Sequence, residues 1–259
     1  MKPFTHKNNA APIALFDSGA GGIGVLREVK KLLPGEQLTF FGDAANAPYG
    51  ERPTAEIRRL VLDHAARLLK DCKALVLACN TATAAAAEEL RQRYPDTPII
   101  GMEPALRPAV SVKEHPTVLV LATAATLREE KFEHLQTNYA KNATVIKIPA
   151  PHIVRLVETG LTDSPEMDAY LEGLLAPFKR DPPDAVVLGC THFPFAANAI
   201  RRVLGRDVPL FDGAQGTARE LARRLAAEHL LAPSNTVGSV TLTASDPRSL
   251  PLFTSLYFQ

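Results

Sequence analysis

Short apolar runs alternate along most of this chain with longer segments in which apolar residues recur every three or four positions. The runs LVLA at 75–78 and VVLG at 186–189 are typical of strands buried on both faces of a parallel sheet. The segment TAEIRRLVLDHAARLLKDC at 54–72 carries its apolar residues on one side of a helix, which Thr54 is expected to cap. This alternation predicts βαβ units and an α/β fold with mainly parallel sheets.

The pattern predicts an ordered series of elements with short loops between them. Strands are expected at 13–16, 38–43, 74–80, 98–102, 117–123, 144–150, 185–191, 209–212 and 239–244. Helices are expected at 23–33, 54–72, 81–94, 126–140, 152–160, 165–179, 193–204 and 217–231.

The series of elements occurs twice. Asp17 follows the first strand of the first series, and Thr123 is assigned the corresponding position 106 residues later. Cys79 and Cys190 also occupy matching places, 111 residues apart. We therefore expect two similar, mainly parallel α/β domains related by pseudo-symmetry, with the active site in the cleft between them. Ligands of such sheets bind beyond the carboxyl ends of the strands, where these residues fall.

Two of the three cysteines, Cys79 and Cys190, follow apolar strands and precede expected helices. A helix N-terminus stabilises a thiolate. A thiolate and a thiol on opposite faces of one small substrate would remove and return a proton at carbon, and so racemise it. Redox chemistry through a disulfide, or nucleophilic attack by Cys190 paired with His192, stays open. Cys72, at the end of a helix, is interpreted as a small buried apolar residue.

The turn DSGAGGIG at 17–24 contains the pattern G-x-G-x-x-G between a strand and a helix, and Asp43 follows at the next strand end. This arrangement is close to a dinucleotide-binding fingerprint. The same glycines would also expose backbone N–H groups at a helix N-terminus, which binds any anion, including an amino-acid carboxylate. Asp17 and Ser18 precede the first glycine, where a negative side chain would crowd a pyrophosphate, so we favour the second interpretation.

Charge and composition exclude several classes of protein. The 259 residues include 29 Lys+Arg and 28 Asp+Glu, and the resulting net charge of +1 argues against a role in binding nucleic acid. No apolar run approaches the roughly 20 residues that span a bilayer, and residues 1–12 lack the apolar core of a signal peptide. The cysteines lack the CxxC spacing of a zinc site. We expect a soluble, cytoplasmic protein without a bound metal.

Five motifs then occur in a fixed order: FDSGAGG, GDAANAPYGERP, ACNTATAAA, GMEPALRPAV and GCTHFPF. Together they resemble the motifs of the glutamate racemase family, within the aspartate/glutamate racemase superfamily, over about residues 13–225. The resemblance implies an isomerase that needs no cofactor and interconverts L- and D-glutamate by two-base proton transfer between two cysteines. It also implies that the product supplies peptidoglycan biosynthesis.

The resemblance implies roles for individual residues. The catalytic pair is Cys79 and Cys190, assisted by Asp17 and His192, and Glu158 is the acidic residue on the side of His192. The residues expected to bind substrate are Asp17, Ser18, Tyr49, Gly50, Asn80, Thr81, Thr123, Thr191 and His192. Without the resemblance, Glu158 would be assigned to a solvated helix face, His192 could equally lie on the surface, and the loop NAPYG could be an ordinary turn.

The resemblance also implies a discontinuous first domain, residues 1–102 with 214–259, and a second domain, residues 103–213. The expected partner is the small-molecule substrate glutamate, with neither nucleic acid nor membrane, and a homodimer is compatible with the resemblance. Three alternatives stay open: a racemase of aspartate or another amino acid, an NAD-dependent oxidoreductase that uses the glycine-rich turn, and a non-catalytic amino-acid-binding protein.

Overall fold

A computed structural model describes residues 8–128 and 130–259. Residues 1–7, and Glu129 of the expected helix 126–140, lie outside the described residues. The chain divides into two compact units. The first unit contains the described residues up to Ala47 together with Arg52–Met102 and Ala214–Gln259, and the second contains Pro48–Glu51 and Glu103–Gly213.

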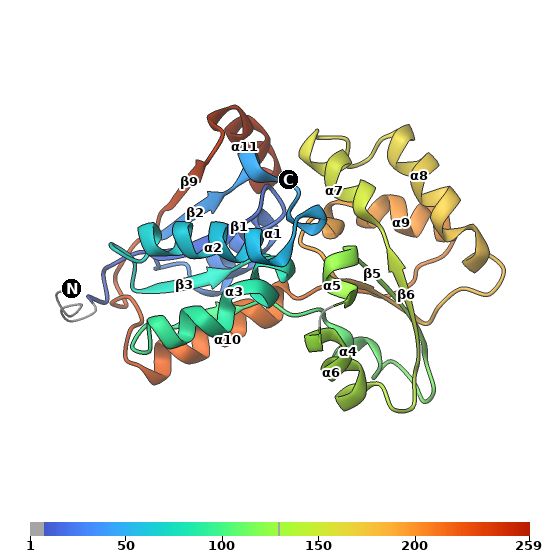
Figure 1. The fold of residues 1–259 in the computed structure, drawn as a ribbon, viewed down its shortest axis with the longest axis horizontal. Coiled ribbons are helices and arrows are strands. Elements are labelled where there is room, and N and C mark those ends of the chain that lie inside the picture. The colour runs from blue at the N-terminus through green and yellow to red at the C-terminus, as the bar shows by residue number, and fades with distance from the viewer. Residues whose placement is uncertain (1–7, 129) are drawn as a thin grey trace. The chain divides into compact units, whose positions relative to one another are not determined.

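The first unit is built on a five-stranded sheet in the order β4-β3-β1-β2-β9, in which all neighbouring strands are parallel (Figure 1). The central strands β1 and β3 are buried along their whole length, as their continuous apolar runs predicted. The strands are β1 (Ile13–Asp17), β2 (Leu38–Gly42), β3 (Ala74–Leu77), β4 (Ile99–Gly101) and β9 (Val240–Ala244).

Helices flank this sheet in two groups, as expected for βαβ units. Helix α2 packs on α3, whereas α1 packs on α10 and α11. The helices of the first unit are α1 (Ile23–Leu32), α2 (Thr54–Leu68), α3 (Asn80–Arg93), α10 (Ala214–Ala227) and α11 (Leu250–Phe258), with short 3-10 turns η1 (Ala44–Asn46) and η5 (Pro247–Ser249).

One local prediction for the first unit was wrong, and one helix was missed. Pro53, in an extended conformation, is the N-cap of α2, no side chain caps that end, and Thr54 is the first helical residue. Helix α11 was not predicted, because its nearly continuous apolar sequence LPLFTSLYF hides the helical period. Its Pro251 stands in the first turn, where the missing N–H costs no hydrogen bond.

The second unit has a four-stranded parallel sheet in the order β6-β5-β7-β8. Read as β8-β7-β5-β6, this order repeats β4-β3-β1-β2 of the first unit, which confirms the internal repeat of two α/β folds. The strands are β5 (Thr117–Ala122), β6 (Thr144–Pro149), β7 (Ala185–Leu188) and β8 (Leu210–Phe211). Strand β7 and all but the first residue of β5 are buried.

The register of the strands corrects one detail of the repeat. Phe16 pairs with Leu77 in the first unit as Leu121 pairs with Leu188 in the second. One residue further along, the counterpart of Asp17 is therefore Ala122, and Thr123 corresponds to Ser18. The prediction that Thr123 is the equivalent of Asp17 was therefore wrong by one residue. Spacing along the chain alone does not determine how two similar strands align.

The longest helix of the second unit has 11 residues, whereas three helices of the first unit have 14 or 15. The expected helix 193–204 is split into a 3-10 turn and α9, and residues 106–109, expected as loop, form α4. The helices are α4 (Leu106–Ala109), α5 (Ala124–Arg128), α6 (Glu130–Tyr139), α7 (Pro151–Glu158), α8 (Pro165–Leu175) and α9 (Ala197–Leu204), with 3-10 turns η2 (Tyr49–Glu51), η3 (Ala176–Phe178) and η4 (Phe193–Ala196). Across residues 8–128 and 130–259, none of the helices has the length and apolar character needed to cross a membrane.

A buried ion pair joins four segments of the first unit. Lys73 Nζ lies 2.6 Å from Glu36 Oε2 and donates a 2.6 Å hydrogen bond to the carbonyl oxygen of Asn9. Glu36 Oε1 accepts a 2.8 Å hydrogen bond from the backbone N–H of Ala232. The two side chains are only 0% and 3% exposed, so each buried charge depends on its partner for compensation.

We expect Lys73→Met to lower the free energy of unfolding by about 3–5 kcal/mol, because the Glu36 carboxylate would stay buried without its partner. Urea denaturation followed by circular dichroism measures this loss. The exposed Lys70→Met is the control and should change stability little. A loss in Lys73→Met no larger than that of the control would contradict the prediction.

Candidate active site

The thiol of Cys79 lies at the start of a long helix. Strand β3 ends at Leu77, and Cys79 keeps an extended backbone as the N-cap of the 14-residue helix α3. Its Sγ accepts a 3.4 Å hydrogen bond from the backbone N–H of Ala82 and lies 3.5 Å from Ser18 Oγ. The partial positive charge of a helix N-terminus favours a negatively charged sulfur at this place.

Asp17 lies at the neighbouring strand end. It is the last residue of β1 and is fully buried. The backbone N–H of Ala78 donates a 2.8 Å hydrogen bond to the carbonyl oxygen of Phe16, which holds the ends of β1 and β3 side by side. Asp17 Oδ1 accepts a 2.8 Å hydrogen bond from the backbone N–H of Gly19. Asp17, Ser18 and Cys79 therefore form one polar cluster in the first unit.

The glycines of the turn do not fit a dinucleotide site. A Cβ at Gly22 would lie 2.7 Å from Asp17 Cβ and 3.1 Å from Ala78 Cβ, so close approach to the strand ends requires glycine there. A Cβ at Gly24 would meet nothing within 4 Å, although the third glycine of the fingerprint serves close packing of helix on strand. The expected ribose-binding acid, Asp43, is fully buried and already accepts hydrogen bonds within the first unit.

Asn80 begins α3 directly after Cys79, and its side chain is unusual. Only 5% of the residue is exposed, yet neither the amide nitrogen nor the amide oxygen has a hydrogen-bond partner among the described residues. Buried polar groups are normally hydrogen-bonded, and an unpaired one costs stability. A polar ligand at the N-terminus of α3 would supply the partner, with a carboxylate the natural fit for the neighbouring N–H groups. Thr81, the next residue, is also buried.

Cys190 follows β7 in the second unit after a single residue, Gly189. A Cβ at Gly189 would lie 2.9 Å from Ala122 Cβ and 3.1 Å from the carbonyl oxygen of Leu121, so the neighbouring strand β5 requires a residue without a side chain. The chain then forms η4, and an α-helix begins only at Ala197. The α-helix therefore does not begin directly after Cys190, as expected, but only after η4. Groups other than a helix N-terminus must stabilise the sulfur of Cys190.

A histidine and a carboxylate lie next to Cys190. Its Sγ is 3.6 Å from Nδ1 of His192, and Nε2 of the same ring is 2.6 Å from Oε1 of Glu158, the last residue of α7. His192 is 2% exposed, and Thr191 is buried beside it. The carboxylate of Glu158 thus contacts the histidine. Its position at a helix end had suggested instead that it extends into solvent.

The neighbours of His192 change its acidity. Burial by itself lowers the pKa of the imidazole, but hydrogen bonds with Cys190 and Glu158, together with the negative charge on both partners, raise the pKa well above the ordinary 6.5. An imidazolium is therefore favoured between the sulfur and the carboxylate at neutral pH. The positive charge of this ring would lie next to the sulfur of Cys190.

Three further expected substrate-binding residues lie in the second unit. A Cβ at Gly50 would lie 2.9 Å from Thr123 Cβ, so the loop approaches this side chain closely. Thr123 Oγ1 accepts a 3.2 Å hydrogen bond from the backbone N–H of Thr126 and lies 3.0 Å from its Oγ1. Tyr49 is buried in η2. The position of Thr123 after β5 thus matches that of Ser18 after β1.

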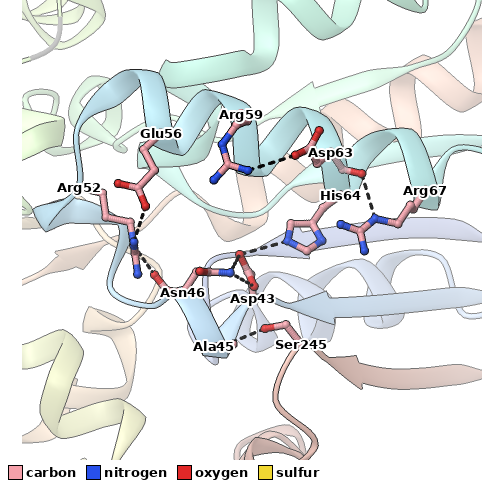
Figure 2. Close-up of polar contacts among 10 residues, drawn as sticks. All are labelled: Asp43, Ala45, Asn46, Arg52, Glu56, Arg59, Asp63, His64, Arg67 and Ser245. Carbon is pink, nitrogen blue, oxygen red and sulfur yellow. Dashed lines mark hydrogen bonds and ion pairs between the residues drawn. The ribbon is translucent and has the colours of Figure 1, made fainter.

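Cys72 and His64 lie outside these clusters. Burial, and to a smaller extent the charge of Asp71, raises the pKa of Cys72 to about 11, which disfavours its thiolate. His64 of α2 received no role from the sequence, because one histidine among apolar residues of a helix looks like an ordinary core residue. Its Nε2 lies 3.2 Å from Asp43 Oδ2 (Figure 2).

Comparisons with known proteins agree on one family. A family model described as Asp/Glu/Hydantoin racemase matches residues 24–221. The chain is 46% identical over 220 residues to a glutamate racemase of Clostridium acetobutylicum, with 85% of each chain covered. It resembles a glutamate racemase from Francisella tularensis solved in complex with D-glutamate, at a TM-score of 0.83 and 26% identity, covering 97% of this chain and 95% of that one. It also resembles Escherichia coli glutamate racemase, solved with L-glutamate and the activator UDP-MurNAc-ala, at a TM-score of 0.81, 30% identity and 95% coverage of both chains.

We expect Glu158→Gln to lower the pKa of His192, because it removes a negative charge and leaves the lowering effect of burial less opposed. The NMR chemical shift of the His192 ring across a pH series measures this pKa. Since the folded-state pKa is raised, the stability that this pair contributes is fully present below about pH 6.5 and is lost as the pH rises through the folded-state pKa.

The same variant should therefore lose that part of the pH dependence of stability. Glu166→Gln, at an exposed position of the second unit, is the control and should leave the His192 titration unchanged. An unaltered titration in Glu158→Gln would show that the carboxylate does not control the histidine.

Proposed function

This chain belongs to the Asp/Glu/Hydantoin racemase family and interconverts L- and D-glutamate, and we propose that it does so by moving the α-proton between Cys79 and Cys190. The D-glutamate formed supplies peptidoglycan biosynthesis, the known role of the family. The observation that carries the mechanism is that each thiol follows an apolar central strand and has its own polar neighbours: Ser18 for Cys79, and His192 for Cys190.

The proposed reaction needs one base and one acid. The thiolate of one cysteine removes the α-proton from one face of the substrate, and the thiol of the other donates its proton to the opposite face. The configuration of the carbon inverts, and the two sulfurs exchange protonation states. Because a thiolate is only a modest base, the site must also stabilise the negative charge that develops on the substrate, which hydrogen-bond donors oriented before the reaction can do.

The two cysteines have different means of stabilising a thiolate. Cys79 has the N-terminus of α3, with a hydrogen bond from the backbone N–H of Ala82. Cys190 has the imidazolium of His192, held by Glu158. We propose that Asp17 and His192 assist proton transfer on their respective sides, with Glu158 maintaining the charge of the histidine.

We propose that the substrate carboxylates bind to N–H and side-chain groups at the strand ends. The buried amide of Asn80, which has no hydrogen-bond partner among the described residues, is the strongest support. The other groups proposed for this role are Asp17, Ser18, Tyr49, Gly50, Thr81, Thr123, Thr191 and His192.

The competing functions make different predictions. A racemase of aspartate would favour that substrate in a panel of amino acids, whereas the relatives described above are glutamate racemases. A non-catalytic binding protein would bind glutamate without exchanging its α-proton. The dinucleotide-dependent oxidoreductase is disfavoured by the environments of Gly24 and Asp43.

Two expectations beyond the reaction are also proposals. We propose that the protein acts in the cytoplasm, where precursors of the cell wall are made, and that it forms a homodimer. Cell fractionation tests the first, and the molar mass from light scattering after size-exclusion chromatography tests the second.

We expect Cys79→Ala and Cys190→Ala each to lower kcat for racemisation at least about 100-fold, because each removes one of the two groups that transfer the proton. Polarimetry with L- and with D-glutamate, without added cofactor, measures the rate in each direction. In deuterium oxide the wild type should replace the α-proton with deuterium.

Cys72→Ala is the matched control, since its thiol is not in either polar cluster, and it should keep wild-type turnover. Full activity in either Cys79→Ala or Cys190→Ala would rule out the two-cysteine mechanism while leaving the racemase activity itself untouched.

We expect Asn80→Ala to raise KM for glutamate roughly tenfold without lowering thermal stability, since the amide has no partner within the described protein to lose. Initial rates over a range of glutamate concentrations, together with a thermal melt, measure both effects. A large fall in Tm with an unchanged KM would instead assign Asn80 a purely structural role.

A further inference from the structure

His64 lies on the buried side of α2, against the sheet of the first unit. Only 8% of the residue is exposed. Its ring stacks on Phe16, with centroids 5.7 Å apart, and packs at a tilt on Phe41, with centroids 4.7 Å apart. The ring is therefore fixed, and its Nε2 points at Asp43, 3.2 Å from Oδ2 (Figure 2).

Asp43 is the first residue after β2 and is fully buried. Its backbone N–H donates a 2.9 Å hydrogen bond to the carbonyl oxygen of Asp17, so it is attached directly to the polar cluster of Cys79. Both of its carboxylate oxygens accept hydrogen bonds from Nδ2 of Asn46, at 3.0 and 3.1 Å. His64 and Asn46 thus hold the carboxylate from two sides, as Figure 2 shows.

Asn46 also contacts the loop that follows it. Its carbonyl oxygen accepts a 2.7 Å hydrogen bond from Nε of Arg52, which pairs in turn with Glu56 at 2.6 Å. The backbone N–H of Ala45 donates a 2.9 Å hydrogen bond to Ser245 Oγ. The loop is therefore held on both sides of the segment Pro48–Glu51, which carries Tyr49 and Gly50.

We infer that His64, Asp43 and Asn46 are positioning residues that hold the loop 44–52 in the conformation needed for substrate binding. The inference rests on the proposed function, because that function assigns Tyr49 and Gly50 to the substrate. Short 3-10 turns such as η1 and η2 have poor hydrogen-bond geometry of their own, so the loop depends on side-chain contacts for its order. Among these contacts are the hydrogen bonds that Asn46 donates to the buried carboxylate of Asp43, and hydrogen bonds to a charged group are strong and directional.

The test compares two substitutions of His64 that differ in one hydrogen-bond donor. His64→Leu removes the donor at similar volume, whereas His64→Gln keeps an N–H group able to reach the Asp43 carboxylate. We expect His64→Leu to raise KM for L-glutamate at least about tenfold, the effect of losing a hydrogen bond to a charged group, with a smaller change in kcat. His64→Gln should recover most of the wild-type KM.

Asn46→Ala gives the same test at a half-buried position, where the substitution does not disturb the core. It should raise KM as His64→Leu does. Hydrogen–deuterium exchange of the backbone amides of residues 44–52, measured without substrate, should be faster in both variants. Arg59→Ala is the matched control: it removes an exposed ion pair with Asp63 from the same helix and should change neither KM nor exchange.

The outcomes distinguish failure of the positioning role from failure of the proposed function. An unchanged KM and unchanged exchange in Asn46→Ala, with His64→Leu folded or not, would overturn the positioning role. So would equal KM values in folded His64→Leu and His64→Gln, because a role in packing alone does not depend on the N–H donor. If the wild type did not racemise glutamate, the proposed function would fall, while faster exchange of the loop in the variants would still show that the network orders it.

Discussion

In each unit two central parallel strands end side by side, and the chain beyond them must leave the sheet within one or two residues. The hydrogen bonds from Ala78 to Phe16 and from Gly189 to Leu121 fix these strand ends in the same register. A Cβ at Gly22 would meet the side chains of Asp17 and Ala78, and a Cβ at Gly189 would meet strand β5, so both positions need a residue without a side chain. Each cysteine therefore lies at the buried carboxyl end of a central strand, close to polar side chains and backbone N–H groups.

The same scaffold carries different chemistry in the two units. At the strand end beside Cys79 the first unit has the carboxylate of Asp17, whereas the register places Ala122, which cannot ionise, at the equivalent position of the second unit. The second unit supplies its ionisable groups from elsewhere, through the turn that carries His192 and the end of α7 that carries Glu158. A repeat of the fold thus need not be a repeat of the site, and we propose that each side keeps its thiolate stable by its own means.

A second layer of buried polar groups supports the first. Asp43 bonds to the backbone of Asp17 and, through Asn46, to the loop that carries Tyr49 and Gly50. His64 and Asn46 both contact this carboxylate and so help to offset the cost of burying it. The acid that the sequence suggested for a ribose therefore has a different role, which depends on a histidine that no local pattern distinguished.

The sequence by itself determined the α/β class, the central strands and the places of both cysteines, because continuous apolar runs and the polar residues that end them are local features. The sequence could not determine that Ala122 is the equivalent of Asp17, that Glu158 contacts His192, or that His64 contacts Asp43. These depend on strand register and on helices that bring residues 21 to 34 positions apart into contact, and no spacing along the chain encodes them. Helix α11 was likewise decided by packing, since Phe253 and Leu256 are buried only once α1 and β9 are in place.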